Sequence, residues 1–188
     1  VISPGSFVDC GRAAVPILTS RLPVDKIAER WALYEQGLDE GGHSEGVRQK
    51  LRAQNALWRN VYVAESDAQA EDELSAFLTE TRHHMMHVRD AHNPDDFVLD
   101  PVTLNVWTDP SVSDAEALPF VLETGSIYGS PERVKEQIAE LHDAGVRHLL
   151  CQTGFGSMSQ QHTLSSMRLF GEKVMPAFST PTAARAAE

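Results

Sequence analysis

Residues 129–178 decide the fold, and they read GSPERVKEQIAELHDAGVRHLLCQTGFGSMSQQHTLSSMRLFGEKVMPAF. Ser130 is a favourable N-cap, and Pro131 suits the first helical position, where its missing N–H group would be unpaired in any case. Gly145 ends the helix because glycine readily adopts a left-handed C-cap conformation. One face of this segment is apolar and consists of Val134, Ile138 and Leu141. The pattern predicts an amphipathic helix between Pro131 and Gly145.

The residues after this helix predict a strand, a glycine loop and a second helix. Residues 148–152 (HLLCQ) are short and apolar, which is typical of a strand buried in a parallel sheet. The loop at 153–157 (TGFGS) follows at the carboxyl end of that strand, where parallel α/β folds bind ligands. The last helix carries an apolar stripe made of Leu164, Met167, Phe170, Val174 and Phe178.

The upstream residues repeat this alternation of strands and helices. Residues 1–2 read as the end of a strand, and residues 3–6 (SPGS) as a tight loop that starts a helix. Residues 15–19 and 57–64 predict two more strands, and residues 43–55 a short polar helix. Two longer helices have apolar faces formed by Val24, Ile27, Trp31, Tyr34 and Leu38, and by Leu74, Phe77, Leu78, Met85 and Val88. The alternation predicts an α/β fold with a parallel sheet.

The segment between about residues 92 and 126 breaks this pattern. It contains prolines, aspartates and short apolar runs, including one at Trp107 and one at 118–122. A connection this long without periodicity is often a functional lid or insertion. We therefore expect one unit over residues 1–178 with an irregular insertion at about 92–126, followed by a flexible tail at 179–188.

Four segments resemble the bacterial-luciferase-like flavin monooxygenases. They read WALYEQGL, VYVAESDAQAEDEL, GSPERVKEQIAELHDAGVRHLLCQTGFG and SMRLFGEKVMPAF. The resemblance implies a (β/α)8 TIM barrel, of which this chain would hold about the carboxyl-terminal half. A complete barrel takes about 250 residues, whereas the chain has 188 and does not begin with Met. We expect a truncated protein, with a naturally short relative as the alternative.

The resemblance also implies a cofactor and a reaction. Reduced FMN, supplied by a separate flavin reductase, would react with O2 to oxidise a small organic substrate. In this family a serine-bearing loop after the fifth strand touches the FMN phosphate, which corresponds here to Ser3, Gly5 and Ser6. Small residues at a helix amino terminus also favour a bound anion on physical grounds. Gln152 offers a donor and an acceptor either to a flavin edge or substrate, or to the neighbouring loop backbone.

The remaining site residues are less defined. Trp107 and Phe155 are candidate apolar walls of the substrate pocket. The family's general bases would lie on early strands outside this chain, so no catalytic residue is predicted. Two alternatives stay open: an F420-dependent oxidoreductase of the same fold that transfers hydride, and a non-catalytic flavin-binding relative. A homo-oligomer is expected in each case.

Composition excludes several other classes of protein. The formal net charge is −11, without a basic cluster, which argues against nucleic-acid or anionic-membrane partners. No apolar run is long enough to span a membrane. The two cysteines, Cys10 and Cys151, form no C-x-x-C motif, and reduced thiols fit a cytoplasmic protein.

Sequence motifs for metal and nucleotide chemistry are incomplete. His83 and His87 share a helical face, but the zincin pattern needs Glu after the first His, and residue 84 is His. The loop TGFGSMS lacks the lysine of a phosphate-binding P-loop and the third glycine of a dinucleotide-binding motif. No G-x-S-x-G elbow is present. We therefore predict no bound metal and a site that relies on a cofactor, because a flavin enzyme needs few titratable side chains.

Overall fold

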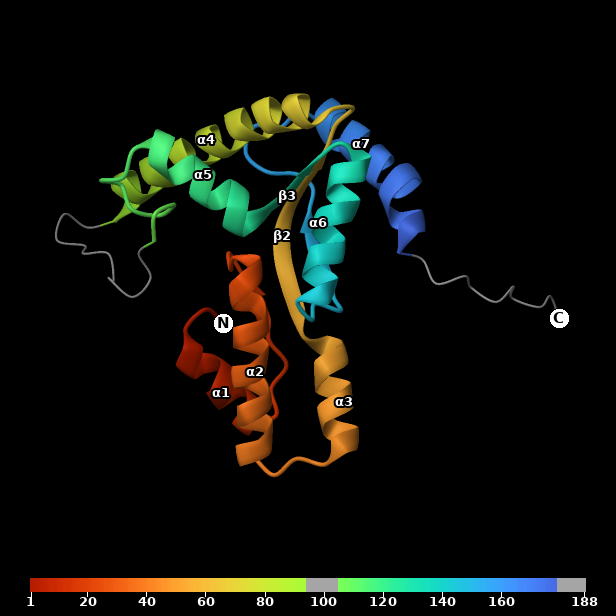
Figure 1. The fold of residues 1–188 in the computed structure, drawn as a ribbon. Helices are drawn as coiled ribbons and strands as arrows, with labels where there is room; N and C mark the ends of the chain where they lie inside the picture. The colour runs from red at the N-terminus through yellow and green to blue at the C-terminus, as the bar shows by residue number, and fades with distance from the viewer. Residues whose placement is uncertain (94–104, 179–188) are drawn as a thin grey trace.

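The computed structural model describes residues 1–93 and 105–178. Its elements follow in the order α1 (Pro4–Arg12), β1 (Leu18–Ser20), α2 (Val24–Glu40), α3 (Glu45–Gln54), β2 (Ala56–Val63), α4 (Asp67–His92), α5 (Asp114–Gly125), β3 (Ser126–Gly129), α6 (Pro131–Asp143), β4 (Leu149–Gln152) and α7 (Gln160–Leu169). A π-helical turn (Phe170–Val174) and a 3₁₀ turn (Met175–Ala177) extend α7. Figure 1 shows β2 at the centre, with α6 running beside it and the pair of α1 and α2 near its lower end. The predicted parallel α/β fold is present.

Strand β2 organises the sheet because every other strand pairs with it in parallel. β1 and β4 both pair with Leu57 and Trp58, so they occupy opposite edges of β2. β3 and β4 both pair with Asn60, so β3 lies beyond β1 on the same edge. Past the end of β4, Ser166 Oγ of α7 accepts a hydrogen bond from the Val63 N–H group at 2.8 Å. The edge of β2 is thereby closed by a helix where β4 stops.

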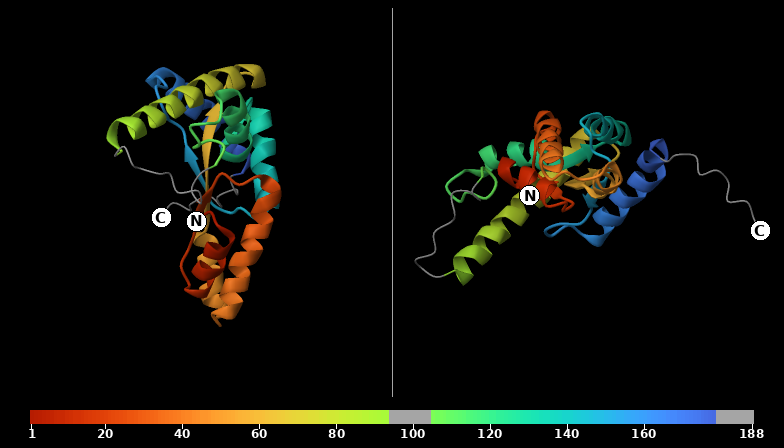
Figure 2. Two further views of the ribbon diagram at one scale, coloured as in Figure 1. Left: turned by 90° about the vertical axis from the view of Figure 1, so that its left-hand side faces the viewer. Right: turned by 90° about the horizontal axis from the view of Figure 1, so that it is seen from below.

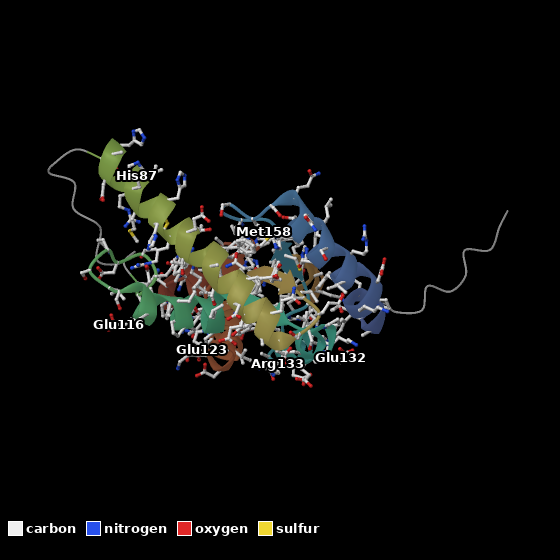
Figure 3. All side chains as sticks on the ribbon, turned by 90° about the horizontal axis from the view of Figure 1, so that it is seen from above. His87, Glu116, Glu123, Glu132, Arg133 and Met158 are labelled. Carbon is white, nitrogen blue, oxygen red and sulfur yellow. The ribbon has the colours of Figure 1, made fainter. Side chains whose placement is uncertain are left out.

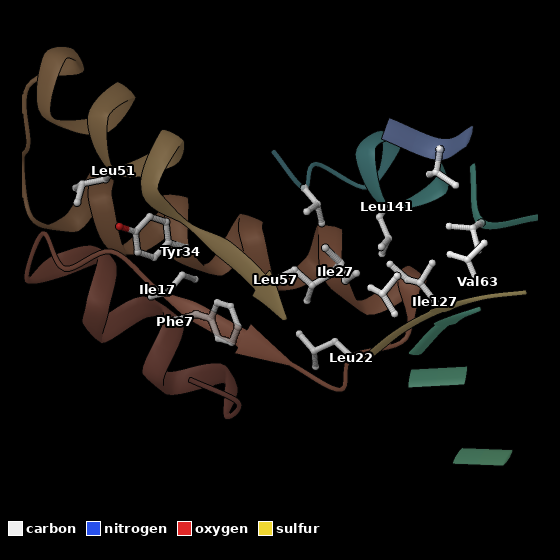
Figure 4. Packing of buried hydrophobic residues seen from close by; sticks show 14 of the residues in the cluster. Phe7, Ile17, Leu22, Ile27, Tyr34, Leu51, Leu57, Val63, Ile127 and Leu141 are labelled. Carbon is white, nitrogen blue, oxygen red and sulfur yellow. The ribbon is translucent and has the colours of Figure 1, made fainter. Parts of the chain in front are cut away.

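The sequence of β2 (ALWRNVYV) explains its central position. Aromatic and β-branched residues suit a pleated, buried strand, and seven of the eight residues of β2 are buried. One face enters the main core between α2 and α6, with Leu57 against Ile27 and Leu141 (Figure 4). The other face carries Tyr62 into a second cluster, where it meets α4 and α5. The strand therefore serves two cores at once.

Helices α1 and α2 pack closely because each contributes a glycine. A Cβ atom at Gly37 would overlap the Val8 carbonyl oxygen, and one at Gly11 would overlap the Tyr34 carbonyl oxygen. Both obstacles are backbone atoms, which cannot rotate away. The two helices can approach this closely only without side chains at these positions.

Helix α4 crosses above the carboxyl end of β2, as the two views in Figures 1 and 2 agree. It begins at its N-cap Ser66, whose side chain accepts from the Gln69 N–H group, as the sequence context of a capped long helix suggests. Arg82, buried near the middle of α4, donates to the carbonyl oxygens of Trp107 and Val112. It also pairs with Asp114 at 2.5 Å, which ties the start of α5 to α4.

The segment expected to be irregular contains regular structure. Residues 114–125 form α5, and the strand β3 follows directly, which the sequence reading missed. A capping box marks the start of α5: the Ser113 N–H group donates to Glu116 at 3.3 Å. Residues 94–104 of the expected insertion and 179–188 of the expected tail lie outside the described residues. The limits of the insertion and the tail remain predictions.

Two other expectations need correction. The strand predicted at 15–19 is β1 at Leu18–Ser20, because Pro16 has no N–H group for a ladder and residues 15–17 form an extended connection instead. β4 is parallel as predicted but not buried, since Leu150 is 38% exposed. Within the described chain β4 pairs only with β2, so its other edge is uncovered.

The apolar stripe predicted for the last helix is not one buried face. Leu164 and Met167 are 51% and 47% exposed, whereas Val174 is fully buried. The π-helical turn at Phe170–Val174 accommodates an extra residue and changes the phase between the two parts of the helix. The helix instead meets the sheet through the buried Ser166 and Val174.

Candidate functional site

The predicted phosphate loop sits beside the carboxyl end of β1. The Val1 amino group donates to the Leu18 carbonyl oxygen at 2.6 Å, and Thr19 Oγ1 donates to the Val1 carbonyl oxygen at 2.7 Å. These bonds place residues 1–2 alongside β1, in the position of a further parallel strand. Ser3 follows as the N-cap of α1, with an extended backbone (φ −71°, ψ 144°).

The hydroxyl groups of Ser3 and Ser6 lie together at the start of α1. Their Oγ atoms are 2.7 Å apart, and the Ser3 side chain makes no capping bond to the helix backbone. An added Cβ atom at Gly5 would find nothing within 4 Å, so the backbone there is open to a close approach. Two hydroxyls and first-turn N–H groups are the donors that a phosphate group accepts from. The loop therefore offers the kind of donors that a phosphate group requires.

Gln152 is the last residue of β4, as predicted. β4 lies at the opposite edge of the sheet from the strand position that leads to Ser3. Its Nε2 atom donates to the Gly154 carbonyl oxygen at 3.2 Å, which is the loop-stabilising role that the sequence left open. The second amide hydrogen and Oε1 are left over from that bond. Three strand spacings separate residues 1–2 from β4, or about 14 Å along the sheet.

The loop after β4 is fastened to α4. Gly156 has φ 59°, and a Cβ atom there would overlap Thr81 Oγ1 and lie 3.1 Å from the Phe77 carbonyl oxygen. Ser157 hydrogen-bonds the Glu80 carboxylate from the same loop. The loop is therefore shaped by the surface of α4 as well as by its own sequence.

Trp107 and Phe155 are placed in the second core cluster, 4% and 8% exposed. The Arg82 guanidinium lies over the Trp107 ring at 6.0 Å, in addition to its bond to the Trp107 carbonyl oxygen. Neither aromatic residue lines the two main pockets found among the described residues. The structure therefore brings them together as packing residues, and their role as walls of a substrate pocket stays a prediction.

The larger pocket, of about 640 Å³, was not anticipated from the sequence. It lies between α5, β3 and α6, and Figure 3 labels two of its lining residues, Glu123 and Arg133. Arg59 lies in its wall, is 2% exposed, and donates to the Leu22 carbonyl oxygen at 2.5 Å. Burial lowers the pKa of Arg59 to about 10, so the guanidinium stays protonated at neutral pH. The pocket is separate from the Ser3 loop and from Gln152.

The histidines of α4 take part in surface contacts. His83 Nε2 lies 2.5 Å from Asp114 Oδ2, and His87 projects from the far part of α4 in Figure 3. Among residues 1–93 and 105–178, no three His, Cys, Asp or Glu side chains gather in a way that could hold a metal ion. No helix in this described part of the chain is both long and apolar enough to cross a bilayer.

The fold and the site geometry are those of a ligand-binding α/β barrel. Parallel strands, with polar loops and hydrogen-bonding side chains at their carboxyl ends, are the ligand-binding arrangement of α/β barrels. The model of the luciferase-like monooxygenase family matches residues 2–148. The chain belongs to the luciferase-like monooxygenase family, and its sheet is part of a (β/α)8 barrel, as the sequence predicted. No curated protein matches the chain.

Solved structures of low sequence identity share this fold. The monooxygenase RslO1 from Streptomyces bottropensis is 18% identical, with a TM-score of 0.61, over 94% of this chain and 46% of that one. The oxygenating constituent of 3,6-diketocamphane monooxygenase from Pseudomonas putida, in complex with FMN, is 21% identical, with a TM-score of 0.57, over 96% and 48%.

A third similar structure uses a different cofactor. The coenzyme F420-dependent tetrahydromethanopterin reductase from Methanopyrus kandleri is 18% identical, with a TM-score of 0.57, over 94% of this chain and 49% of that one. The chain therefore spans about half the length of the solved structures it matches. The family includes FMN-dependent monooxygenases and F420-dependent oxidoreductases.

Proposed function

We propose that this chain is part of a flavin-dependent monooxygenase that uses reduced FMN and O2 to oxidise a small organic substrate. The observation that carries the proposal is the hydroxyl pair of Ser3 and Ser6 at the open start of α1. A monoester phosphate such as that of FMN fits this small, donor-rich site. Membership in the luciferase-like family supplies the reaction class.

In this proposal the described residues bind and orient. Ser3 and Ser6 donate their hydroxyl hydrogens to the phosphate, and the Gly5 N–H group adds a backbone donor. Gln152 presents Oε1 and its free amide hydrogen to the ring system at the far end of the nucleotide. Bound reduced FMN would supply the electrons that activate O2. The loop after β4, fixed against α4 at Gly156, would keep water from that end of the site.

The second candidate is an F420-dependent hydride-transfer oxidoreductase. It is favoured by the similar F420-dependent reductase and by an F420-dependent secondary alcohol dehydrogenase, which is 16% identical with a TM-score of 0.59. The same loop and glutamine would then meet the phosphate-bearing tail and the ring of the deazaflavin. A non-catalytic flavin-binding role is the third possibility.

The test is a fluorescence titration of the full-length protein with reduced FMN and with F420, each with and without O2. Binding of reduced FMN with oxygen-dependent substrate oxidation supports the monooxygenase. Binding of F420 alone, with turnover that persists without O2, replaces it by the second candidate. Binding without any turnover leaves the flavin carrier, and absence of binding overturns all three.

The partners follow from the proposal. A monooxygenase of this kind would receive reduced FMN from a separate flavin reductase, which places it in the cytoplasm with the reductant pool. We also propose a homo-oligomer. Sedimentation of the full-length protein, alone and mixed with a flavin reductase, tests the assembly, and a single monomeric species would contradict it.

A further inference from the structure

Strand β2 has a second face that the main core does not use. Side chains alternate along a strand, and Leu57 and Val61 face the main core. Asn60 therefore points to the opposite face of the sheet. On β4 the same face carries Leu150, which is 38% exposed because nothing in the described chain covers it. Asn60 lies on the side of the sheet opposite the main core, level with the carboxyl end of β4.

The strand register places Gln152 directly beside Asn60. The two residues are Cα partners in the parallel pairing of β2 with β4, and Ser126 is the partner of Asn60 on the other edge. Paired residues of parallel strands project to the same side. Ser126 already donates to the Val121 carbonyl oxygen at 3.1 Å. Asn60 and Gln152 are two adjacent carboxamides, of which Gln152 gives one amide hydrogen to the Gly154 carbonyl oxygen and keeps the other and Oε1.

Asn60 is buried but has no partner. It is 5% exposed, and its side chain makes no hydrogen bond to residues 1–93 or 105–178. In the described chain, the side-chain nitrogen and oxygen atoms that are both inaccessible to solvent and without a hydrogen bond are Arg30 Nε and Trp31 Nε1. The carboxamide atoms of Asn60 are not among them, so they keep some contact with solvent. Buried polar groups in folded proteins are nearly always hydrogen-bonded. The carboxamide is therefore presented to something outside these residues.

Asn55, near the same strand, is a buried asparagine whose side chain has a structural hydrogen bond. It precedes β2, is 8% exposed, and its Oδ1 atom accepts from the Ile17 N–H group at 2.9 Å. The two asparagines are similarly buried and five residues apart, Asn55 just before β2 and Asn60 within it. Of these two asparagines, Asn55 is hydrogen-bonded and Asn60 has a carboxamide without a hydrogen-bond partner among the described residues.

Neighbouring strands lie about 4.8 Å apart, so the side chains of Asn60 and Gln152, which are paired in register, can offer alternating donors and acceptors side by side. This array suits a planar ring that carries an N–H group between two carbonyl groups. We propose that Asn60 and Gln152 form the hydrogen-bonding edge for the pyrimidinedione ring that FMN and F420 share. The inference rests on the proposed flavin or deazaflavin function, and it holds for either cofactor.

The proposal predicts that replacing Asn60 affects thermal stability and cofactor binding in opposite ways. Leucine has the same branching and the same number of side-chain heavy atoms as asparagine, and it has no polar group to leave unsatisfied. Because Asn60 has no partner in the free chain, Asn60→Leu is expected to keep or raise the melting temperature. The same change removes a donor and an acceptor from the bound ring, so the Kd for the cofactor is expected to rise about tenfold or more.

The experiment compares wild type, Asn60→Leu, Gln152→Leu, the double variant and the matched control Asn55→Leu in the full-length protein. Fluorescence titration with oxidised FMN and oxidised F420 gives Kd, absorbance gives the shift of the bound ring spectrum, and thermal unfolding gives Tm. We expect weaker binding and a smaller spectral shift for both site variants, with less than additive loss in the double variant. Asn55→Leu is expected to lower Tm and leave Kd unchanged.

Each result decides one point. If wild type binds either cofactor and Asn60→Leu leaves Kd unchanged, the inference is overturned while the proposed function stands. A lower Tm for Asn60→Leu with unchanged Kd assigns Asn60 a structural role and also overturns it. If wild type binds neither cofactor, the proposed function itself fails.

Discussion

Removing the hydroxyl group of Ser6 tests whether the loop at the start of α1 binds the FMN phosphate. Ser6→Ala removes one of the two hydroxyls that lie 2.7 Å apart at the start of α1. If Ser6 donates to the phosphate, FMN binding is expected to weaken by roughly 1–2 kcal/mol, because hydrogen bonds to charged groups contribute about that much. Isothermal titration of the full-length protein measures the change. Riboflavin, which lacks the phosphate, is the control ligand and is expected to bind both proteins equally.

Equal loss of riboflavin and FMN affinity would show that Ser6 acts on the fold of the loop. Unchanged FMN affinity would remove Ser6 from the site.

The carboxyl group of Asp114 makes the free energy of unfolding depend on pH in the acidic range. Hydrogen bonds from His83 and then from Arg82 lower the pKa of this carboxyl group below its usual value. A group with a lowered folded-state pKa stabilises the protein above its unfolded-state pKa of about 4, and this contribution is lost as pH falls through the folded value. Asp114→Asn is therefore expected to be less stable than wild type at pH 7, with the difference disappearing below about pH 4.

The expected difference at pH 7 is about 1 kcal/mol, because solvent screens a side chain that is 37% exposed. Urea unfolding at pH 7, 5 and 3.5 measures it, with Asp72→Asn on the exposed side of α4 as the control. A difference of the same size at all three pH values would exclude the carboxylate as its source.

At the scale of elements, the glycine contact between α1 and α2 positions the Ser3 loop. In Gly37→Ala the new Cβ atom meets the Val8 carbonyl oxygen, so α1 has to move. We expect a loss of about 3 kcal/mol in the free energy of unfolding, at the upper end of overpacking effects. Because α1 carries Ser3 and Ser6, FMN affinity is expected to fall as well.

Gly46→Ala is the matched control for this change. Position 46 lies in α3, and an added Cβ atom there meets nothing within 4 Å. It is expected to be neutral or to stabilise by up to about 1 kcal/mol, since alanine favours helix. Chemical denaturation of both variants provides the comparison, and equal effects would refute the role assigned to the helix contact.

The elements that the sequence predicted well carry their own signals. Helix α6 has its cap and its terminal glycine within the segment, and β2 is mostly apolar on both faces. β3 was missed because it has four residues, and its strand conformation depends on pairing with β2, 66 positions earlier in the chain. Helix α5 was missed although Ser113 and Glu116 match the capping-box pattern, because Pro119 suggested that no helix continues through this segment.

The site was predictable only where local sequence defines it. A serine–proline–glycine loop at a helix start is visible in the chain, and the structure places it beside the end of β1. Asn60 was not visible, because residues 57–64 were predicted only as a strand and nothing local distinguishes Asn60 from Asn55. Their difference comes from a partner at Ile17, which only the fold supplies. Trp107 and Phe155 share a core for the same non-local reason.

At the scale of the whole molecule, one helical surface is exposed and apolar. Leu164 and Met167 lie three residues apart on α7 and are 51% and 47% exposed. Neighbouring exposed apolar side chains of this size favour association. The double variant Leu164→Gln/Met167→Gln is therefore expected to bind less hydrophobic dye than wild type, with an unchanged circular dichroism spectrum. Val88→Gln, at an exposed site on α4, is the control for a change in composition alone.

Undiminished dye binding in the double variant would mean that another surface holds the dye. Light scattering on the same samples shows whether the change also alters the state of association.

The contact at Gly156 sets a rule for directed evolution of this scaffold. Randomising the loop after β4 is the natural way to search for new substrate ranges, yet position 156 admits no side chain while Thr81 stays where it is. Position 154 is different, since a new Cβ atom there has 3.6 Å to its nearest neighbour in Thr163. A productive library varies 154, retains glycine at 156, and recombines loop sequences only together with the α4 residues that shape them.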